Sequence, residues 1–457
     1  MNKKTLQLLL DNIIESEVDF GEIFYENTLV KTYEVIDSKL DTINSRITHG
    51  VGIRLAHNND IVYGYTNDLK KKSLYELVSR IKNNFSNNRL IKEVNLERLK
   101  ISRDKSVIKH NDMDDNKKKE YLLNIDKLAR SIDSRIVQVD TVFYESDSEV
   151  IIANTNNTYV KENRPLTRLN ITVIAKDDKR QTKSSKSYGI SGGYELLDEI
   201  DIKKEVENLA ISAIKKLSAK PCPSGEMPVI IGPGFGAVIF HEACGHSMEA
   251  TTVSYNTSIL SGKLNEKIAS SKVSIIDDGT LKAKWGTTVY DDEGNKTRKN
   301  VLIKNGVLKG YLIDYLNNRK MNMEITGSGR RESYKYAPTS RMNNTYLVKG
   351  HDKIEDMIKS VKYGIYAVNM GGGSVDPVTG DFNFAVNEAY LIENGKITDM
   401  VLGGSLIGNT LDILNNVSMV SDDLSFDTGF CGSVSGNVPV TIGEPTILVS
   451  KILVGGN

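Results

Sequence analysis

Two histidines and a glutamate lie within the six residues His241-Glu242-Ala243-Cys244-Gly245-His246. Neutral imidazoles are common zinc ligands, and a carboxylate beside them can act as a general base. The familiar zinc-protease helix motif places its histidines four residues apart, so that both rings share one face of the helix. Here the spacing is five residues, which on a regular helix turns the rings apart by roughly 140° rather than about 40°. We therefore expect an irregular helix, because a regular one could not direct both rings at one ion.

Gly245 is the position at which the extra residue is most easily absorbed. A single-turn bulge or a helix end there would bring His246 back beside His241. Glu242 directly follows the first histidine, so its side chain would lie beside the ion rather than bind it. That position suits a general base that takes a proton from a water molecule at the site. The motif therefore indicates a metal hydrolase with Glu242 as its base.

The sequence around the motif predicts a strand, a tight turn and a helix. Pro228-Val229-Ile230-Ile231 is typical of a buried strand, Gly232 to Gly236 of a turn, and Ala237 to about Ala250 of a helix. Gly234-Phe235-Gly236 also resembles a phosphate-binding turn. However, no Gly-Lys-Ser/Thr follows, and Ile239 replaces the third glycine of a dinucleotide fingerprint. We expect these glycines to shape the turn and not to bind phosphate.

Other interpretations of the motif stay open. A histidine in an apolar helix is often a core residue with its hydrogen bonds satisfied, and Ala237 and Phe240 make these surroundings apolar. A metal bound here could also be purely structural. A catalytic zinc site has three protein ligands and one open position. Cys244 offers a third ligand within the motif, but chelation by three residues of one short turn would be strained.

Length, charge and cysteine content limit the classes of protein to consider. The 457 residues suffice for two or three lobes with a sizeable core. The 59 basic residues balance the 59 acidic ones, which removes the broad positive field typical of nucleic-acid binding. Three distant cysteines cannot form a disulfide framework, and the apolar run Leu6 to Leu10 is too short for a signal peptide or a membrane span. We expect a cytoplasmic protein that binds neither nucleic acid nor membranes.

The first half of the chain predicts an N-terminal α+β domain, residues 1–220, of antiparallel sheets with flanking helices. A helix, a series of short alternating strands and a second helix are expected over residues 1–90. Among these strands, Leu40 to Ile47 and Gly50 to Ala56 are separate. The same order of elements recurs near residues 116–218, which suggests an internal duplication.

A second domain, residues 221–457, is predicted to be rich in β-strands around the motif-bearing helix. Two prolines and a glycine in Lys220-Pro221-Cys222-Pro223-Ser224-Gly225 break the preceding helix and mark the boundary. Asn305-Gly306 and Asn394-Gly395 each lie between two apolar runs, which is a strong signal for a two-residue hairpin turn.

Several further stretches combine unusual residues in a fixed order along the chain. They are Gly50-Val51-Gly52-Ile53-Arg54, Trp285-Gly286, Tyr290-Asp291-Asp292-Glu293-Gly294, Arg330-Arg331-Glu332-Ser333-Tyr334, Arg341-Met342-Asn343-Asn344-Thr345, Asp376-Pro377-Val378-Thr379-Gly380-Asp381-Phe382, Cys431-Gly432 and Val438-Pro439-Val440. Together with the HExxxH pattern at His241 to His246, they resemble the TldD branch of the TldD/PmbA metallopeptidase family. The resemblance covers nearly the whole chain and is densest from residue 225 onward.

The resemblance implies a metal, an activity and an assembly. It implies one zinc ion per chain, held by His241, His246 and Cys431, with Glu242 as the base. It also implies hydrolysis of short or unfolded peptides in the enclosed cavity of a dimer, either a homodimer or a heterodimer with a sister subunit. The family's sister subunit lacks the HExxxH residues, so this chain is similar to the catalytic type.

The chemistry of Cys431 agrees with this ligand set. A thiolate is a good zinc ligand, and binding to the ion deprotonates a thiol outright. The family pattern usually has a lysine two residues after the cysteine and a glutamine further on, whereas here these positions look like Ser433 and Asn437. This departure leaves the ligand in place but puts any role of the lysine in doubt. The alternative for a free cysteine is a small buried apolar residue, which we expect for Cys222 and Cys244.

Some charged and aromatic residues are further candidates for the site. A peptide carboxylate or the scissile carbonyl could be bound by Arg330, Arg331, Tyr334 and Arg341, with surface ion pairs as the alternative. The run Asp291-Asp292-Glu293 could bind a hard cation, although the glycine after it favours a solvated turn.

The sequence thus predicts a zinc-dependent peptidase that uses Glu242 and the metal to activate water. The alternative is a non-catalytic binding or regulatory subunit with a structural metal site, as the family's older association with DNA gyrase regulation suggests. The zero net charge argues against direct binding of DNA.

Overall fold

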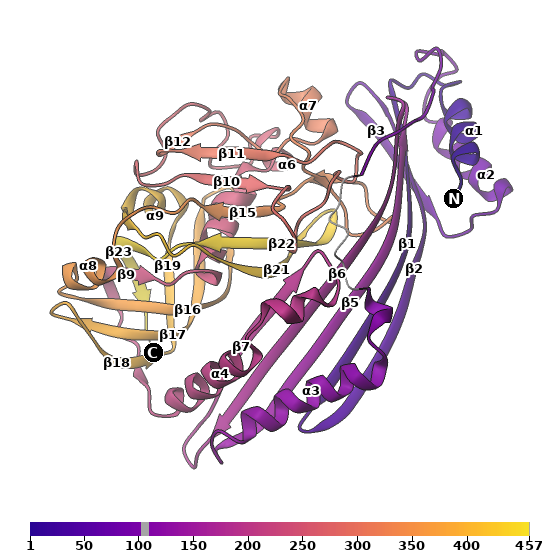
Figure 1. Ribbon diagram of the computed structural model, residues 1–457. Helices are drawn as coiled ribbons and strands as arrows, with labels where there is room; N and C mark the ends of the chain where they lie inside the picture. Colours follow the sequence, from indigo (N-terminus) through magenta and orange to yellow (C-terminus); the bar gives the residue numbers. More distant parts are fainter. Residues whose placement is uncertain (102–108, 457) are drawn as a thin grey trace.

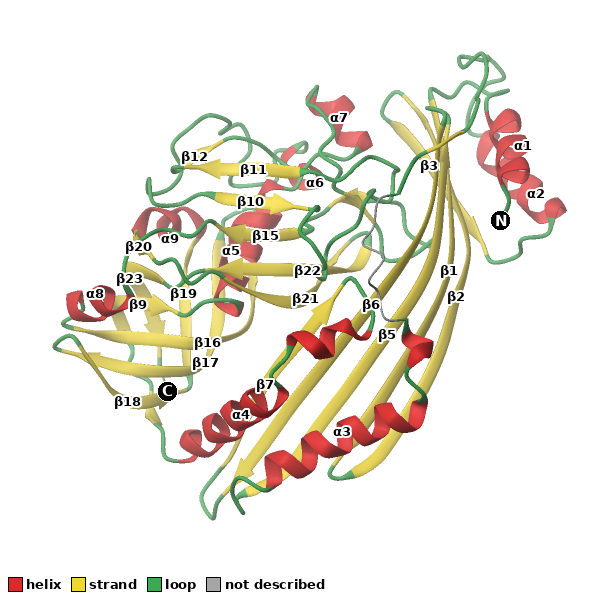
Figure 2. Cartoon of the chain, viewed as in Figure 1, coloured by secondary structure: helices red, strands yellow, loops and turns green. Residues whose placement is uncertain are grey.

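The computed structural model describes residues 1–101 and 109–456 and has the expected α+β fold, with helices packed on mainly antiparallel sheets (Figure 2). A long curved sheet from the first half of the chain lies beside the strands of the second half (Figure 1). The domain boundary at residue 220 stays a prediction.

The first half forms one sheet whose strands run in the order β3-β2-β1-β5-β6, with β7 also paired to β6 and short β4 at the far end of β6. The strands are β1 (Phe20–Ile36), β2 (Lys39–His57), β3 (Asp60–Thr66), β4 (Glu97–Arg98), β5 (Ile136–Asn154), β6 (Thr158–Lys176) and β7 (Gln181–Ile190). At its centre β1 pairs antiparallel with β5, with Leu29 opposite Asp147.

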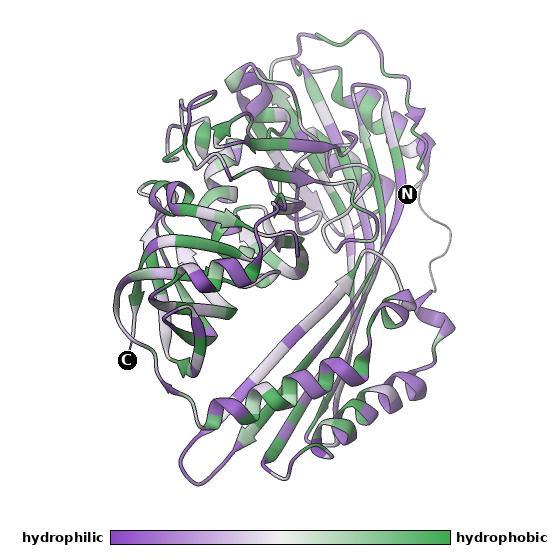
Figure 3. Cartoon of the chain, turned by 60° about the vertical axis from the view of Figure 1, so that its left-hand side comes forward, coloured by the Kyte–Doolittle hydropathy of each residue, from purple (hydrophilic) through white to green (hydrophobic). Residues whose placement is uncertain are grey.

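Helices cover one face of this sheet. Alternate residues of a strand point to opposite faces, so every second residue of a strand points toward these helices. On β1, Ile23 and Tyr25 belong to the core formed with α1 (Lys3–Ile13) and α2 (Lys71–Lys82). The other end of the same face packs against α3 (Asp115–Arg130) and α4 (Ile202–Leu217). Phe24, which points the opposite way, packs against Tyr290 and Tyr334 of the second half. Hydrophilic and hydrophobic residues accordingly alternate along the helices and strands (Figure 3).

The element order is the same in the two parts of this sheet. One helix, three strands and another helix give α1-β1-β2-β3-α2, and then α3-β5-β6-β7-α4. The order supports the internal duplication, which stays a prediction.

The separation of Leu40–Ile47 from Gly50–Ala56 was wrong, because both belong to the single strand β2. Between them, Thr48 and His49 stay in register with Thr28 and Asn27 of β1. The strand therefore continues through a polar stretch that gives no apolar alternation in the sequence.

Besides a small sheet formed by β13 (Gly329–Arg330) and β14 (Thr339–Ser340), two large sheets make up most of the second half. One contains β8 (Lys220–Pro221), β9 (Gly225–Ile231), β16 (Tyr363–Val375), β17 (Asp381–Glu393), β18 (Lys396–Leu402), β19 (Gly404–Asn409), β20 (Val417–Val420) and β23 (Ile447–Gly455). The other runs in the order β12 (Val307–Leu308), β11 (Lys299–Lys304), β10 (Ile275–Asp278), β15 (Asn344–Leu347), β22 (Gly436–Glu444) and β21 (Ser425–Ser433). A continuous apolar core from Cys222 to Val454 joins the two sheets and encloses the motif.

Short elements connect these sheets. They are β13 (Gly329–Arg330), β14 (Thr339–Ser340), α5 (Val238–Phe240), α6 (Ala250–Val253), α7 (Tyr315–Met321), α8 (Ile354–Ser360) and α9 (Thr410–Asn416). Both predicted hairpin turns are confirmed. Asn305-Gly306 joins β11 to β12 and Asn394-Gly395 joins β17 to β18, and all four residues have positive φ. Among the described residues, every helix is too short or too polar to cross a lipid bilayer.

Buried ion pairs hold the first sheet against the second half. Arg54 of β2 lies 2.7 Å from Glu22 of β1 and 2.8 Å from Glu293, and all three side chains are at most 1% exposed. Glu22 also accepts a hydrogen bond from Arg331. These charges cross between sequence-distant segments, so the two halves meet through a buried polar network.

Candidate metal centre

A tight turn leads from β9 into the motif. Gly234 has φ of 82°, and a Cβ at this position would lie 2.4 Å from Asp427 Oδ2. A Cβ at Gly236 would lie 2.1 Å from Glu444 Oε1. The glycines thus let the turn pack directly against β21 and β22, as expected for a structural turn.

The motif itself is not one regular helix. After a 3₁₀ turn at residues 235–237 and the short α5, residues His241–Gly245 form a π-helical turn, and His246 begins a further 3₁₀ turn. The N–H of His246 donates to the carbonyl of His241, five residues earlier. This is the irregularity that the five-residue spacing predicted. The two imidazole rings now lie on one side of the helix, with centroids 5.5 Å apart and ring planes at 81°.

Gly245 permits the turn for a steric reason. Its φ is −58°, an ordinary helical value. A Cβ at this position, however, would lie 2.0 Å from Met342 Sδ. Close packing of Met342, and not backbone freedom, therefore favours glycine here.

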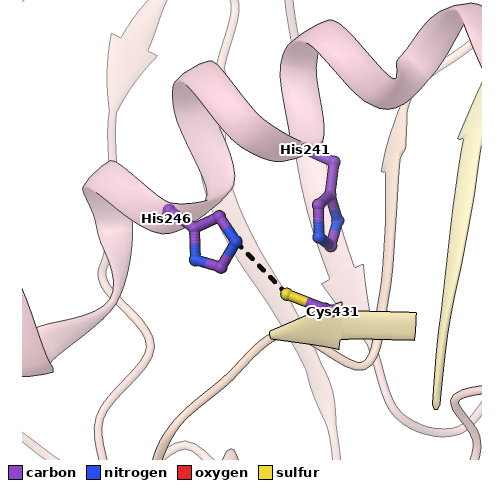
Figure 4. Close-up of side chains that lie close together, drawn as sticks. All are labelled: His241, His246 and Cys431. Carbon is purple, nitrogen blue, oxygen red and sulfur yellow. Dashed lines mark hydrogen bonds between the residues drawn. The ribbon is translucent and has the colours of Figure 1, made fainter. Parts of the chain in front are cut away.

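The third member of the centre comes from the far end of the chain. Cys431 lies on β21, opposite Val438 of β22, and its Sγ is 3.2 Å from His246 Nε2. One ligand atom from each of His241, His246 and Cys431 lies within 4.8 Å of the others. Figure 4 shows the three side chains pointing toward one another from the motif helix and the strand.

Electrostatics at the centre favour the thiolate. Burial by itself raises the pKa of the Cys431 thiol, but the neighbouring His241 and His246 outweigh it and bring this pKa down to about 3. Burial lowers the pKa of His246, but Glu249 and Cys431 outweigh it and hold this pKa well above its ordinary value. The surroundings of Cys431 therefore stabilise the form of the side chain that binds zinc.

Glu242 lies beside the ligand atoms. Its Oε2 is 3.5 Å from His246 Nε2, and its side chain is 28% exposed, compared with 16% for His246. His241 and Cys431 are both buried. Glu242 is therefore the carboxylate of the motif that can meet water at the edge of the centre.

Glu249 is a residue that the sequence did not single out. Its Oε2 lies 3.0 Å from His246 Nδ1, and the side chain is 3% exposed. A metal-binding histidine usually donates its second ring N–H to such a carboxylate. The signal was available in the sequence, since Glu249 follows His246 by one helical turn.

The donor set fits a zinc ion. Two imidazoles and a thiolate are ligands that zinc commonly takes, and they leave room for a fourth position. The Nδ1 atom of His241 is buried and has no hydrogen-bond partner among the described residues. A buried ring nitrogen without a hydrogen-bond partner is explained when the imidazole serves as a metal ligand or when the nitrogen binds water.

Three of the expected peptide-binding residues lie outside the group formed by His241, His246 and Cys431. Arg330, Arg331 and Tyr334 line a cavity of about 970 Å³ between the first sheet and the second half. Arg331 donates to Glu22 and to the carbonyl of Asp292, and the Tyr334 N–H donates to Glu26. The hydrogen bonds to Glu22 and Glu26 connect the second half of the chain to the first sheet.

Arg341 lies beneath the metal centre, and its side chain is 0% exposed. It donates to the carbonyl of Cys431, to Ser435 Oγ at 3.0 Å and to the Gly436 carbonyl at 2.8 Å. It therefore holds the β21–β22 hairpin and does not face an open cavity.

The solvated turn expected at Asp291-Asp292-Glu293 was wrong, because all three residues are buried. Asp291 accepts bonds from the N–H groups of Glu293, Asn295 and Gly329. The other two carboxylates pair with arginines of the first sheet, Asp292 with Arg164 and Glu293 with Arg54. The run thus belongs to the interface between the two halves.

The remaining cysteines are buried apolar residues. Cys222 and Cys244 are free thiols with 3% and 0% exposure, and burial raises the pKa of both. Neither belongs to the His241, His246 and Cys431 group.

Comparison with protein families gives matches along most of the chain. The PmbA/TldA metallopeptidase C-terminal domain matches residues 224–456, the central domain residues 108–219 and domain 1 residues 21–84.

Relatives with curated names match along their whole length. A metalloprotease TldD homolog of Haemophilus influenzae is 34% identical over 470 residues, 100% of this chain and 97% of its own. One of Buchnera aphidicola subsp. Acyrthosiphon pisum is 33% identical over 466 residues, with 100% and 96% covered. A zinc metalloprotease TldD homolog of Saccharolobus solfataricus is 27% identical, with 97% and 98% covered.

Solved structures share the fold. A proposed modulator of a DNA gyrase from Thermotoga maritima superposes with a TM-score of 0.80 at 22% identity, covering 99% of this chain and 100% of its own. TldE from Thermococcus kodakarensis gives a TM-score of 0.78 at 21% identity, covering 99% and 100%.

Proposed function

The chain belongs to the TldD/PmbA metallopeptidase family, and we propose that it is a zinc-dependent peptidase that hydrolyses short or unfolded peptides. One observation carries the proposal. His241, His246 and Cys431 bring their ligand atoms within 4.8 Å, although 185 residues separate the last two. Relatives named metalloproteases support the same activity.

We assign His241, His246 and Cys431 as the ligands of one zinc ion. When bound, zinc supplies a Lewis acid that polarises the peptide carbonyl and makes water more acidic. Two neutral imidazoles and a thiolate leave a net charge of about +1 on the site, lower than with three histidines. Water is then less strongly acidified, so the protein base carries more of the work.

Glu242 is that base in our proposal. Its carboxylate, 3.5 Å from His246 Nε2 and partly exposed, would take a proton from the attacking water and give it to the departing amine. No second group is needed for this transfer, because one carboxylate can act first as base and then as acid.

The peptide would bind largely through its backbone. An extended peptide can add to an exposed strand edge with main-chain hydrogen bonds, which tolerate many sequences. The cavity lined by Arg330, Arg331 and Tyr334 is large enough for several side chains and is the place we propose for flanking parts of the substrate.

The Glu242→Gln and His241→Ala variants test the proposal. Glu242→Gln should keep zinc, measured by elemental analysis of the purified protein, and lose about 10²- to 10⁴-fold in the rate of peptide cleavage. His241→Ala should lose the metal. Glu355→Gln, at an exposed position on α8, is the matched control and should change neither.

Two results would contradict the proposal. Parental cleavage by Glu242→Gln would exclude that residue as the base. A zinc-loaded chain that leaves a mixture of short peptides intact, with and without a chelator, would favour the binding or regulatory role. The cytoplasmic location and the dimer stay proposals, and light scattering of the purified chain tests the dimer.

A further inference from the structure

Two buried side chains, Glu249 and Arg341, connect the segments that carry the metal ligands. Glu249 starts the turn after the motif, and Arg341 follows β14. Their side chains are 3% and 0% exposed. Neither residue offers a ligand atom to the centre formed by His241, His246 and Cys431.

Glu249 acts on the motif side. Its Oε2 lies 3.0 Å from His246 Nδ1 and can accept the ring N–H. When a neutral His246 donates Nδ1–H to Glu249, the ring atom that it presents as a ligand is Nε2, the atom beside Cys431. Glu249 therefore favours this tautomer of the neutral ring and orients it.

Arg341 acts on the strand side. It donates to the backbone carbonyl of Cys431, and through its other nitrogen to Ser435 Oγ and the Gly436 carbonyl. These acceptors lie on both strands of the β21–β22 hairpin and on its turn. A planar guanidinium with several donors can fix such a set of acceptors, whereas an ammonium cannot.

The two residues face each other. Arg341 Nε lies 3.7 Å from Glu249 Oε1, and both atoms are buried without a hydrogen-bond partner in the described part of the chain. A buried charge is costly unless an opposite charge compensates it. Glu249 therefore compensates the charge of Arg341 through one oxygen, while its other oxygen faces His246.

We propose that Glu249 and Arg341 are positioning residues that hold His246 and Cys431 in one ligand geometry. The proposal rests on the proposed zinc centre. The motif helix and β21 are far apart in sequence, and this charge pair joins them directly behind the ligands. Its role is to keep the distance between the His246 ring and the Cys431 thiolate fixed before an ion arrives.

Zinc affinity and a cobalt spectrum test the proposal in the full-length chain. Glu249→Gln keeps the shape but removes the charge, and Arg341→Lys keeps the charge but removes the planar set of donors. Each should weaken zinc binding about 10- to 100-fold, measured by competition with a coloured chelator. With Co²⁺ in place of zinc, Arg341→Lys should weaken and shift the thiolate-to-metal absorption band, because the strand bearing Cys431 moves.

Matched controls separate positioning from ordinary stability. Arg54→Lys and Glu22→Gln change buried ion-pair residues of the interface, whose ion pairs are with each other, with Glu293 and with Arg331, and not with the residues of the centre. They should lower the melting temperature of the metal-free chain but leave the zinc dissociation constant and the cobalt spectrum unchanged. The double variant of Glu249 and Arg341 should lose less affinity than the product of the single losses, because the two side chains work as a unit.

The outcomes are distinguishable. Unchanged zinc affinity and cobalt spectrum in both variants, with normal binding by the parent chain, would overturn this proposal and leave the proposed function intact. A parent chain that binds no zinc would overturn the proposed function. If Arg341→Lys does not fold, Glu249→Gln decides by the same two measurements.

Discussion

Met342 decides which residue can stand at position 245. Its sulfur fills the space that a side chain on Gly245 would need, at a point where the π-helical turn brings the two histidines together. The backbone there is helical, so an alanine would be free of strain in the absence of Met342. The ligand spacing and the packing below it therefore depend on each other.

We predict that Gly245→Ala weakens zinc binding by at least about tenfold, because either the turn or Met342 must move. Competition with a chelator measures the effect. Adding Met342→Ala should restore much of the affinity by emptying the space. A Gly245→Ala chain with parental affinity would show that the turn does not depend on this contact.

The proximity of the two histidines could be predicted from the sequence, but the groups behind them could not. On a regular helix, the five-residue spacing would turn the rings of His241 and His246 roughly 140° apart. An irregular turn is therefore needed to bring the two rings together. Arg341 was expected to bind peptide. An arginine side chain indicates that an anionic or acceptor group lies nearby, but the sequence does not identify that group. The contacts of Arg341 with the Cys431 segment exist only after distant strands have come together.

At the scale of the elements, the long strands of the first sheet were predicted only in part. Apolar alternation predicted β2 as two pieces, whereas the structure has one continuous strand of 19 residues. The middle of the sheet is polar on the face that lines the cavity. There the Thr28 hydroxyl donates to Glu26 and forms a hydrogen bond with the Ser148 hydroxyl. Hairpin turns were predicted correctly, since Asn-Gly fixes the turn locally, but register over a polar stretch depends on the neighbouring strand.

Glycines on β2 let this sheet approach the second half. A Cβ at Gly52 would lie 1.9 Å from Tyr63 Oη and 2.5 Å from the backbone oxygen of Tyr334. We predict that Gly52→Ala lowers the free energy of unfolding by about 1–3 kcal/mol, because the strand is overpacked and must shift. Urea unfolding of the purified chain measures this.

Gly372→Ala on β16 is the control, because nothing lies within 4 Å of a Cβ at that position. Its unfolding midpoint should stay close to that of the parent. Equal midpoints for Gly52→Ala and the parent would show that the contact with Tyr334 is not tight in solution.

At the scale of the whole molecule, buried charges lie in the junction between the halves, beside the apolar contacts of Phe24 with the second half. Arg54 sits between Glu22 and Glu293, and Arg331 adds a second cation to Glu22. Burial raises the pKa of Glu293, which Arg54 opposes. These ion pairs therefore hold the halves in one relative position, and Arg54 is the cation that pairs with Glu293.

We predict that Arg54→Met destabilises the folded chain by about 3–5 kcal/mol, because it leaves Glu293 buried without its cation and Glu22 with Arg331 alone. Thermal and urea unfolding measure the loss. Lys72→Met removes an exposed charge of the Lys72–Glu76 pair on α2, 88% and 65% exposed, and should change little. A similar small effect of both substitutions would mean that the junction does not depend on its ion pairs.

The far separation of Cys431 from the histidines has a consequence for the timing of synthesis. A ribosome adds about 5–20 residues each second, so the 185 residues between His246 and Cys431 take on the order of 10 to 40 s. On the proposed ligand assignment, the nascent chain has only two of the three zinc ligands during that interval, so we expect it to have no peptidase activity. A chain that stops before Cys431 would lack the complete centre in the same way.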